Sequence, residues 1–282
     1  MPLCKRIIPK LDIKGDNLVK GINLEGLRVL GKPEIFAKNY YDNGADELFY
    51  QDVVASLYGR NTLDDQIKKT AKEIFIPLTV GGGIRNIDDI ARILTLGADK
   101  ISINSAAINK PIFIKKAAET FGSSTIVVSI EAKLILNKYY AFTENGRNNS
   151  NKLLEDWIQQ AQDYGAGEIS ITFIDHEGIG SGIDFGYLKK ILNKIKIPVI
   201  INGGIGNKVH VLNLFKNKSI SGVVISSMLH YALLRKLKFN SNNYTLGNID
   251  FLENQKTNNN FEKIDIYKLK KYLKKNNIPI NI

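Results

Sequence analysis

Cysteine is nearly absent from this sequence, which contains only Cys4 in 282 residues. A single thiol cannot build a disulfide framework or a thiolate metal site, so both classes of stapled domain are excluded. No stretch approaches the ~18 consecutive apolar residues of a membrane-spanning helix. The opening residues MPLCKRIIPK contain no apolar run of signal-peptide length. We therefore expect a protein of the reduced cytoplasm that does not contact a membrane and uses no metal and no other cofactor.

Acidic residues are scarce relative to basic ones, at 28 against 39, which gives a formal net charge of +11. Such an excess can indicate nucleic-acid binding. The lysines are dispersed, however, and the densest run, at 268–275, has a helical period with Leu269, Tyr272 and Leu273 on one face. Its lysines are typical of a solvated helix face. We expect no nucleic-acid partner, and the basic balance suits an anionic, phosphorylated substrate.

Short apolar runs alternate with helical patterns along the chain. The runs are rich in Val and Ile without strict alternation, as in strands buried on both faces. Strict βα alternation indicates a parallel sheet, and eight units favour a closed (βα)8 TIM barrel over an open doubly wound sheet. We predict one barrel domain over residues 1–282. The eight predicted strands cover residues 5–13, 47–55, 76–82, 99–105, 125–132, 167–175, 197–203 and 221–227.

Three motifs of the first half of the chain recur in the second half. They are LTVGGGIRN (78–86) with VIINGGIGN (199–207), ISINS (101–105) with VVISS (223–227), and LDIK (11–14) with IEAK (130–133). The paired positions are Gly82 with Gly203 and Asn104 with Ile225, each 121 residues apart, and Asp12 with Glu131, 119 residues apart. Nearly equal offsets predict two duplicated half-barrels, which place like chemistry on opposite sides of one barrel mouth.

The segment 238–263 interrupts this rhythm because it is rich in Asn and has little apolar periodicity. We interpret it as an inserted loop before the last helix. It is either surface filler or, alternatively, a lid or a partner contact.

Two glycine-rich turns, at 81–83 and 203–204, stand at predicted strand ends and precede helical patterns. Glycine lets backbone N–H groups approach a phosphate closely, and loops after strands seven and eight of a barrel are a recurrent phosphate site. The duplication predicts a second site after strands three and four. The alternative is that these glycines only turn the chain. The predicted phosphate-binding residues are Gly82, Gly83, Asn104, Ser105, Gly178, Gly203, Gly204 and Ser226.

Asp12 and Glu131 are predicted to end the first and fifth strands, opposite each other. Two carboxyl groups facing across a pocket can act as general acid and general base. The alternative is that both bind water or neighbouring amides. His176 follows the sixth strand, and we interpret it as polar surface.

Four charged residues mark the other ends of the strands. Arg6, Glu47, Lys100 and Glu168 fall at the starts of strands one, two, four and six, where they can ring the bottom of the barrel. From the residues alone, a structural salt-bridge network is the preferred interpretation.

Together these segments resemble the cyclase subunit of imidazole glycerol phosphate synthase, over nearly the whole chain except the Asn-rich insert. The motifs are specific to that family and its close paralogues. The matching segments are KRIIPKLDIK, LVKGINLEGLRVLGKP, GADELFYQD, LTVGGGIR, GADKISINSAA, FGSSTIVVSIEAK, LLEDWI, GAGEISITFID and NGGIGN.

The resemblance implies a heterodimer with a glutaminase subunit docked at the barrel bottom. Ammonia from that partner would pass a gate made by the four charges, which reverses the structural interpretation of them. It would then attack phosphoribulosyl formimino aminoimidazole carboxamide ribotide, a substrate with two phosphates, to give imidazole glycerol phosphate and aminoimidazole carboxamide ribotide. The resemblance gives Asp12 the acid/base role and places Lys20 on a mobile loop that closes over the substrate.

Four residues at the active rim depart from the family pattern. Glu131 stands where the family has Asp, Lys10 where it has Cys, Glu177 where it has Asp, and Asn202 where it has Ser. The histidine-pathway reaction is our first hypothesis. The alternatives are a paralogue that delivers ammonia to an acetamidino-type sugar of a surface polysaccharide, and a partner scaffold without catalysis. The sister isomerase of the pathway is disfavoured by the four gate charges and by the DELFYQD segment.

Overall fold

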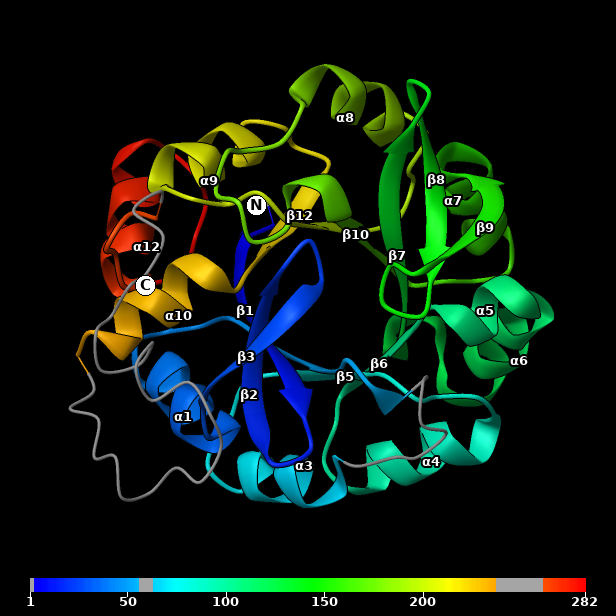
Figure 1. The fold of residues 1–282 in the computed structure, drawn as a ribbon, viewed down its shortest axis with the longest axis horizontal. Helices are drawn as coiled ribbons and strands as arrows, with labels where there is room; N and C mark the ends of the chain where they lie inside the picture. Colours follow the sequence, from blue (N-terminus) through cyan, green and yellow to red (C-terminus); the bar gives the residue numbers. More distant parts are fainter. Residues whose placement is uncertain (1–2, 56–62, 237–260) are drawn as a thin grey trace.

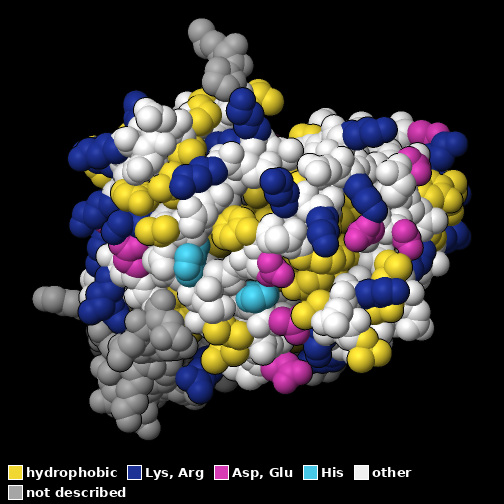
Figure 2. Space-filling view, turned by 90° about the horizontal axis from the view of Figure 1, so that it is seen from above, with side chains coloured by type: hydrophobic (Ala, Val, Ile, Leu, Met, Phe, Trp, Pro, Cys, Tyr) yellow, Lys and Arg dark blue, Asp and Glu magenta, His cyan; other side chains and the backbone are white. Residues whose placement is uncertain are grey.

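The structure is a computed structural model that describes residues 3–55, 63–236 and 261–282. Of the predicted insert at 238–263, all but the last three residues lie outside the described part. Within the described residues, every helix is too short or too polar to cross a membrane. Figure 2 shows that Lys and Arg side chains on the visible face are spread among hydrophobic and acidic ones and form no single patch.

Eight parallel strands close into a barrel, as predicted (Figure 1). The barrel is closed by the parallel pairing of the first and the last of these eight strands, in which Glu168 lies opposite Val127 and Phe173 lies opposite Ala132. In the order in which they neighbour each other, the strands are β10 (Glu168–Phe173), β11 (Val199–Asn202), β12 (Ile220–Ile225), β1 (Arg6–Lys14), β4 (Leu48–Asp52), β5 (Leu78–Gly81), β6 (Lys100–Ile103) and β7 (Ile126–Ile135).

Helices surround the barrel and cover the outer faces of the strands (Figure 1). Asn86 and Asn207, 121 residues apart, both cap the start of a helix with side-chain oxygens that accept backbone N–H groups. The α-helices are α1 (Pro33–Asp42), α3 (Asp64–Ala71), α4 (Ile87–Thr95), α5 (Ser105–Asn109), α6 (Ile112–Phe121), α7 (Leu154–Asp163), α8 (Phe185–Leu192), α9 (Lys208–Phe215), α10 (Ser227–Leu234) and α12 (Ile266–Lys275); η1 (Ser123–Thr125) and η2 (Ile174–His176) are short 3₁₀ turns.

Side chains that alternate along each strand form two separate hydrophobic clusters, one outside the barrel and one inside it. In β1, Ile7 and Leu11 point outward into the main hydrophobic core, beneath the helices. Ile8 points the other way and packs with Phe49, Ile200 and Val224 in a separate small cluster. Since neighbouring side chains on a strand face opposite sides, this cluster fills the middle of the barrel.

Two antiparallel hairpins, which the sequence did not predict, extend β1 and β7 beyond the barrel. They are formed by β2 (Asn17–Ile22) with β3 (Glu25–Gly31), and by β8 (Lys138–Thr143) with β9 (Asn148–Leu153). Asp12 of β1 lies opposite Val19 of the first hairpin, and Glu131 of β7 lies opposite Phe142 of the second hairpin. Both carboxyl residues therefore lie at the carboxyl ends of the barrel part of their strands, as predicted, because the parallel pairing ends at Ile13 and Ala132 and only the antiparallel hairpin pairing continues beyond.

The backbone confirms the duplication at the glycine-rich turns. Gly82 and Gly203 have φ values of 101° and 96°, and Gly83 and Gly204 have 70° and 72°. These angles lie in the left-handed region that favours glycine. A Cβ atom on Gly203 would lie 2.8 Å from the Phe173 carbonyl oxygen, so the turn needs glycine for space as well.

The pairing of Asn104 with Ile225 is corrected by the structure. Asn104 caps α5 with φ −127° and ψ −87°, and Ser226 caps α10 with φ −114° and ψ −84°. Ile225 is instead the last residue of β12. Asn104 and Ser226 are therefore the equivalent positions, 122 residues apart.

Candidate active site

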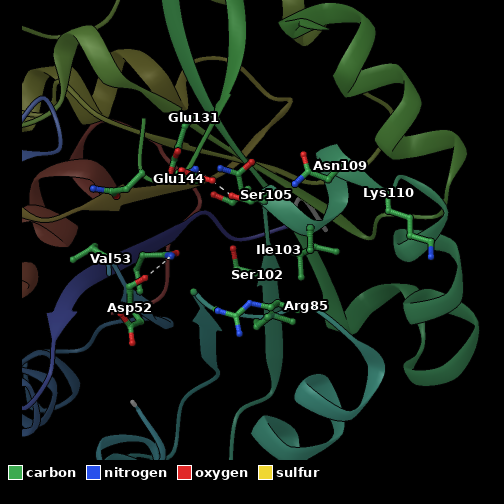
Figure 3. Close-up of a pocket in the computed structure, with 18 residues that line it drawn as sticks. Asp52, Val53, Arg85, Ser102, Ile103, Ser105, Asn109, Lys110, Glu131 and Glu144 are labelled. Atoms are coloured by element: carbon green, nitrogen blue, oxygen red, sulfur yellow. Dashed lines mark hydrogen bonds between the residues drawn. The ribbon is translucent and has the colours of Figure 1, made fainter. Parts of the chain in front are cut away.

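A cavity of about 380 Å³ opens at the carboxyl ends of β4 to β7 (Figure 3). Because barrels bind substrates at this end, it is the natural candidate for the substrate site. Five predicted residues line it, namely Gly82, Gly83, Asn104, Ser105 and Glu131. Arg85 and Lys110 also line the cavity, and their positive charge suits a phosphate group.

The predicted phosphate-binding residues around the second glycine-rich turn, at 203–204, form the second phosphate set. They also come together, but they enclose far less space. Gly178, Gly203, Gly204 and Ser226 line a cavity of about 10 Å³, enough for about one water molecule. Two of the N–H groups expected to meet a phosphate are already bonded. Gly203 N–H donates to Asn202 Oδ1 at 2.8 Å, and Gly204 N–H donates to the His176 carbonyl at 2.9 Å. In this conformation the space among these residues is too small for a phosphate group.

Asp12 is buried at the barrel mouth beside two ammonium groups. Lys10 Nζ lies 3.0 Å from Asp12 Oδ1, and Lys20 Nζ lies 3.8 Å from Asp12 Oδ2. Burial raises the pKa of Asp12, but the two lysines outweigh it and hold the pKa below its usual value. Asp12 is thus ionised at neutral pH and can accept a proton.

Lys20 reaches this position from β2 and is only 2% exposed. It forms an ion pair with the carboxylate of Glu177, which is also buried. Burial lowers the pKa of Lys20, but Glu177 and Asp12 raise it more, so the pKa lies above its usual value. The β2–β3 hairpin, which Figure 1 shows in front of the barrel, is therefore closed, with its lysine inside.

Glu131 lies across the site in a different environment. Its carboxyl group is within the barrel mouth, with part of the side chain open to the large cavity. Gly146 N–H donates to Glu131 Oε2 at 2.8 Å. Burial raises the pKa of Glu131 to about 7, against the opposing effects of this hydrogen bond and of Lys10. Glu131 can therefore carry a proton near neutral pH, where an ordinary Glu is ionised.

Asp12 and Glu131 therefore differ in protonation although both are carboxyl groups. Two groups whose environments push their pKa values apart are suited to be base and acid in one reaction. In this pair, Asp12 can remove a proton and Glu131 can donate one. Within the described residues, no cluster of three or more His, Cys, Asp and Glu side chains has the geometry of a metal site.

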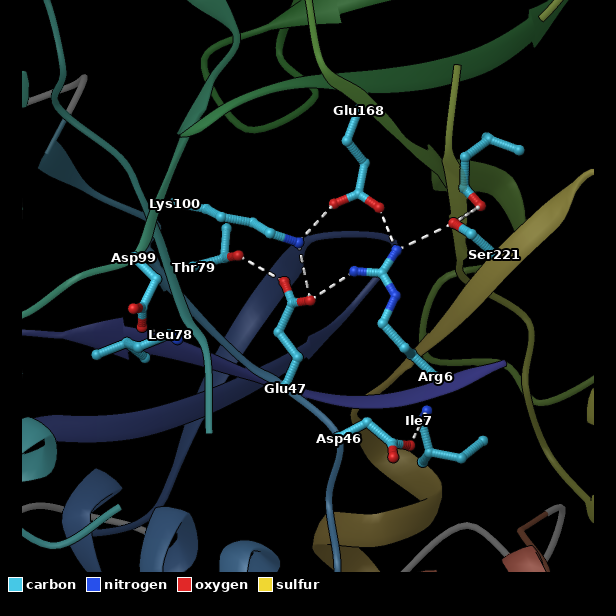
Figure 4. A network of polar contacts seen from close by, with 11 residues as sticks. Arg6, Ile7, Asp46, Glu47, Leu78, Thr79, Asp99, Lys100, Glu168 and Ser221 are labelled. Atoms are coloured by element: carbon cyan, nitrogen blue, oxygen red, sulfur yellow. Dashed lines mark hydrogen bonds and ion pairs between the residues drawn. The ribbon is translucent and has the colours of Figure 1, made fainter. Parts of the chain in front are cut away.

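At the other end of the barrel, the four predicted charges form a closed ring (Figure 4). Arg6 pairs with Glu47 at 2.6 Å and with Glu168, while Lys100 lies 3.0 Å from Glu47 and 3.1 Å from Glu168. Burial lowers the pKa of Arg6 and raises that of Glu168, but the ion pairs outweigh burial in both, so Arg6 has a raised and Glu168 a lowered pKa. Arg6 and Glu168 are thus held in their charged forms.

Two hydroxyl groups that the sequence did not single out complete this ring. Thr79 Oγ1 donates to Glu47 at 2.6 Å, and Ser221 Oγ accepts from Arg6 at 3.0 Å (Figure 4). Ser221 in turn donates to the Val199 carbonyl at 2.8 Å. Such fully bonded charges are rigid, which makes the ring a defined element of the fold.

Comparison with known proteins identifies the family. The family model described as histidine biosynthesis protein matches residues 6–235. The chain belongs to this histidine biosynthesis family. Three proteins named imidazole glycerol phosphate synthase subunit HisF are similar to it. The one from Legionella pneumophila is 50% identical over 71% of this chain and 95% of its own length. That from Staphylococcus saprophyticus is 44% identical over 80% and 90%, and that from Campylobacter concisus is 40% identical over 99% and 98%.

In this member of the histidine biosynthesis family, sequence reasoning missed several residues and contacts that hold the site together. Arg85 lies two residues after the GGG turn and Lys110 five residues after ISINS, so their closeness in sequence to these motifs was a usable signal. The Lys20–Glu177 ion pair joins residues 157 positions apart and had no local signal. The same is true of Gly146, whose N–H group bonds Glu131. His176, predicted as polar surface, is half-buried, and its backbone carbonyl accepts from Gly204.

Proposed function

We propose that this chain is the cyclase subunit of an imidazole glycerol phosphate synthase. It would use ammonia to convert phosphoribulosyl formimino aminoimidazole carboxamide ribotide into imidazole glycerol phosphate and aminoimidazole carboxamide ribotide. The observation that carries the proposal is one barrel with a differently protonated carboxyl pair at its mouth and a charged ring at its base. The three relatives named as subunits of this synthase support it.

The carboxyl pair has a definite task in this reaction. When ammonia attacks a carbonyl carbon, the nitrogen must lose protons and the oxygen must gain them before it leaves as water. Ionised Asp12 is suited to accept a proton from nitrogen, and protonated Glu131 is suited to donate one to oxygen. Lys20, buried beside Asp12, supplies positive charge for oxygen atoms that become negative.

The two phosphate groups would fix the substrate across the mouth. The first binds among Gly82, Gly83, Asn104 and Ser105, where the cavity has room and Arg85 is close. The second binds near Gly178, Gly204 and Ser226 once the loop carrying His176 has moved. Anchoring both ends leaves the reactive centre between Asp12 and Glu131.

We further propose that a glutaminase subunit docks below the charged ring and forms a heterodimer with this chain. Support comes from the ring itself and from Phe75, which precedes β5 at the same end and is 82% exposed. Ammonia would pass the ring and move through the barrel past Ser102 and Ser170, whose buried side chains lie among the apolar residues of the interior. We expect the reaction to take place in the cytoplasm.

The replacement Asp12→Asn tests this function. Asn has the same shape but cannot accept a proton, so turnover with ammonium should be abolished while substrate affinity stays within roughly tenfold. The measurement is formation of imidazole glycerol phosphate by purified protein supplied with the intermediate and ammonium. Normal turnover in the variant would show that Asp12 is not the base. Glu131→Asp serves as the companion variant and reports whether the longer side chain is required.

The second candidate function is delivery of ammonia to a sugar acceptor. It is favoured by the small second phosphate set, in which Asn202 already bonds Gly203 N–H. A wild-type protein that binds the glutaminase but makes no imidazole glycerol phosphate would support this alternative.

A further inference from the structure

The turn between β8 and β9 contacts three parts of the candidate site with three consecutive residues. The contacts are Glu144 N–H to Ser105 Oγ (3.1 Å), Asn145 Nδ2 to the Leu24 carbonyl (3.2 Å) and Gly146 N–H to Glu131 Oε2 (2.8 Å). Figure 3 shows Glu144, Ser105 and Glu131 together at one side of the cavity. The turn thus joins the first phosphate set, the β2–β3 hairpin and the acid of the carboxyl pair.

We propose that Asn145 is a positioning residue that couples closure of the β2–β3 hairpin to the placement of Glu131. Its side-chain amide bonds the tip of one hairpin to the turn of the other. The next residue, Gly146, holds the Glu131 carboxyl group through its N–H. If the β2–β3 hairpin opens, Asn145 loses its acceptor, and the turn that fixes Glu131 loses its outer support.

The backbone of this turn explains why it needs support. Glu144, Asn145 and Gly146 have φ values of 55°, 58° and 77°. Two successive non-glycine residues in the left-handed region carry conformational strain, which surrounding contacts must offset. The turn is therefore sensitive to the loss of a single contact.

Packing at the hairpin tip supplies part of that support. Leu24, from the tip of the β2–β3 hairpin, is buried in a cluster with Phe142 and Ile174. A Cβ atom on Gly146 would lie 3.2 Å from Leu24 Cδ1 and 3.1 Å from Ile174 Cδ1, so the turn fits closely against both. Opening the hairpin would remove Leu24 from this cluster together with the hydrogen bond to Asn145.

The β2–β3 hairpin also places a charged side chain beside Asp12, the other carboxyl group. Asn23 N–H donates to the Glu177 carbonyl at 2.9 Å, and Lys20 pairs with the Glu177 carboxylate and lies 3.8 Å from Asp12. One closing movement would therefore place Lys20 beside Asp12 and, through Asn145, fix Glu131. Acid and base would become competent together.

Two variants of Asn145 test the coupling. Asn145→Gly keeps the left-handed backbone and removes the amide, and Asn145→Asp keeps the shape but cannot donate to the Leu24 carbonyl. Asn137→Gly is the matched control, because Asn137 has φ 64° and is exposed at the other end of β8. Hydrogen exchange of the Gly146 and Asn23 amides, measured by NMR, should be about fivefold faster in both Asn145 variants, as expected for loss of one hydrogen bond.

The control should leave both amides unchanged. Exchange equal to wild type in the Asn145 variants, or an equal rise in Asn137→Gly, would overturn the coupling. The catalytic consequence rests on the proposed function. There, kcat with ammonium should fall by about tenfold in the Asn145 variants while KM changes less than about threefold, since the acid is misplaced but the phosphate anchors remain. A wild-type protein without cyclase activity would contradict the proposed function, whereas the exchange result would still decide the coupling.

Discussion

At the scale of single residues, the protein shifts the pKa values of two carboxyl groups in opposite directions by changing what surrounds them. Asp12 is buried between Lys10 and Lys20, which stabilise its charge. Glu131 is partly buried, its carboxyl group accepts the Gly146 N–H, and its pKa rises to about 7. The Glu131 side chain reaches the Gly146 turn, whose N–H group donates to its carboxyl at 2.8 Å.

The raised pKa of Glu131 makes a prediction about stability. The folded protein binds this proton more tightly than the unfolded chain, so stability is lost as pH rises from the usual Glu pKa through about 7. Glu131→Gln mimics the protonated form. It should stabilise the protein by about 3 kcal/mol at pH 8 and by much less at pH 4.

Thermal unfolding at both pH values checks this expectation. Glu119→Gln is the control, because Glu119 lies on the exposed face of α6, and it should change Tm little at either pH. An equal Tm change for Glu131→Gln at pH 4 and pH 8 would show that Glu131 is not held protonated by the fold.

At the scale of elements, each duplicated turn needs glycine for two separable reasons, a positive φ angle and the close approach of neighbouring backbone. Gly82 has φ 101°, and a Cβ atom there would overlap the Asp52 carbonyl oxygen. Gly44 also has positive φ, 82°, but a Cβ atom there would meet nothing within 4 Å. Gly82→Ala should lower the free energy of unfolding by about 3 kcal/mol or more, against about 1 kcal/mol for Gly44→Ala.

Chemical denaturation of the two variants measures the difference. Phosphate binding should also weaken in Gly82→Ala, since the backbone beside the cavity must move, and should be unchanged in Gly44→Ala. Equal destabilisation by the two replacements would show that backbone angle alone, and not close approach to Asp52, requires glycine at position 82.

The elements also show which features the sequence could predict. All eight barrel strands follow from their Val- and Ile-rich runs, because both faces of each strand are buried. The β8–β9 hairpin was missed, since β9 reads NNSNKL and is mostly polar and exposed. Its partner hairpin reads NLVKGI and EGLRVLG, with glycines inside both strands, which weakens a strand pattern.

The candidate site, like the fold, could be predicted only in part from the sequence. Glycine-rich turns and strand-end carboxyl residues recur at nearly one offset, and this repetition singled out Asp12, Glu131 and the two turns as candidates. The bonds that tune them come from loops whose positions depend on the closed fold. The Asn145 contact with Leu24 joins residues 121 positions apart, and only the arrangement of two hairpins over one barrel brings them together.

At the scale of the whole molecule, the barrel has two chemically different ends. The mouth holds the cavity and the carboxyl pair, and the base holds the charged ring. Glu47 and Glu168 lie 121 residues apart, so the duplication that made the two glycine-rich turns also supplied both acids of the ring. Arg6 and Lys100 have no charged counterpart at that offset, and Ser221 occupies the position equivalent to Lys100.

The proposed passage of ammonia through the ring leads to the last prediction. Lys100→Ala removes one of two cations, so Glu47 and Glu168 keep only Arg6 as their charged partner. The ring should loosen and leak, and coupling to the glutaminase should suffer more than the chemistry at the distant mouth. We expect the ratio of glutamine-dependent to ammonium-dependent activity to fall by about tenfold with the partner present, whereas Lys115→Ala on the exposed face of α6 should leave it unchanged. The ammonium-dependent rate reports whether the variant is folded. A ratio equal to wild type in folded Lys100→Ala would make the ring a structural network only, with ammonia entering by another route.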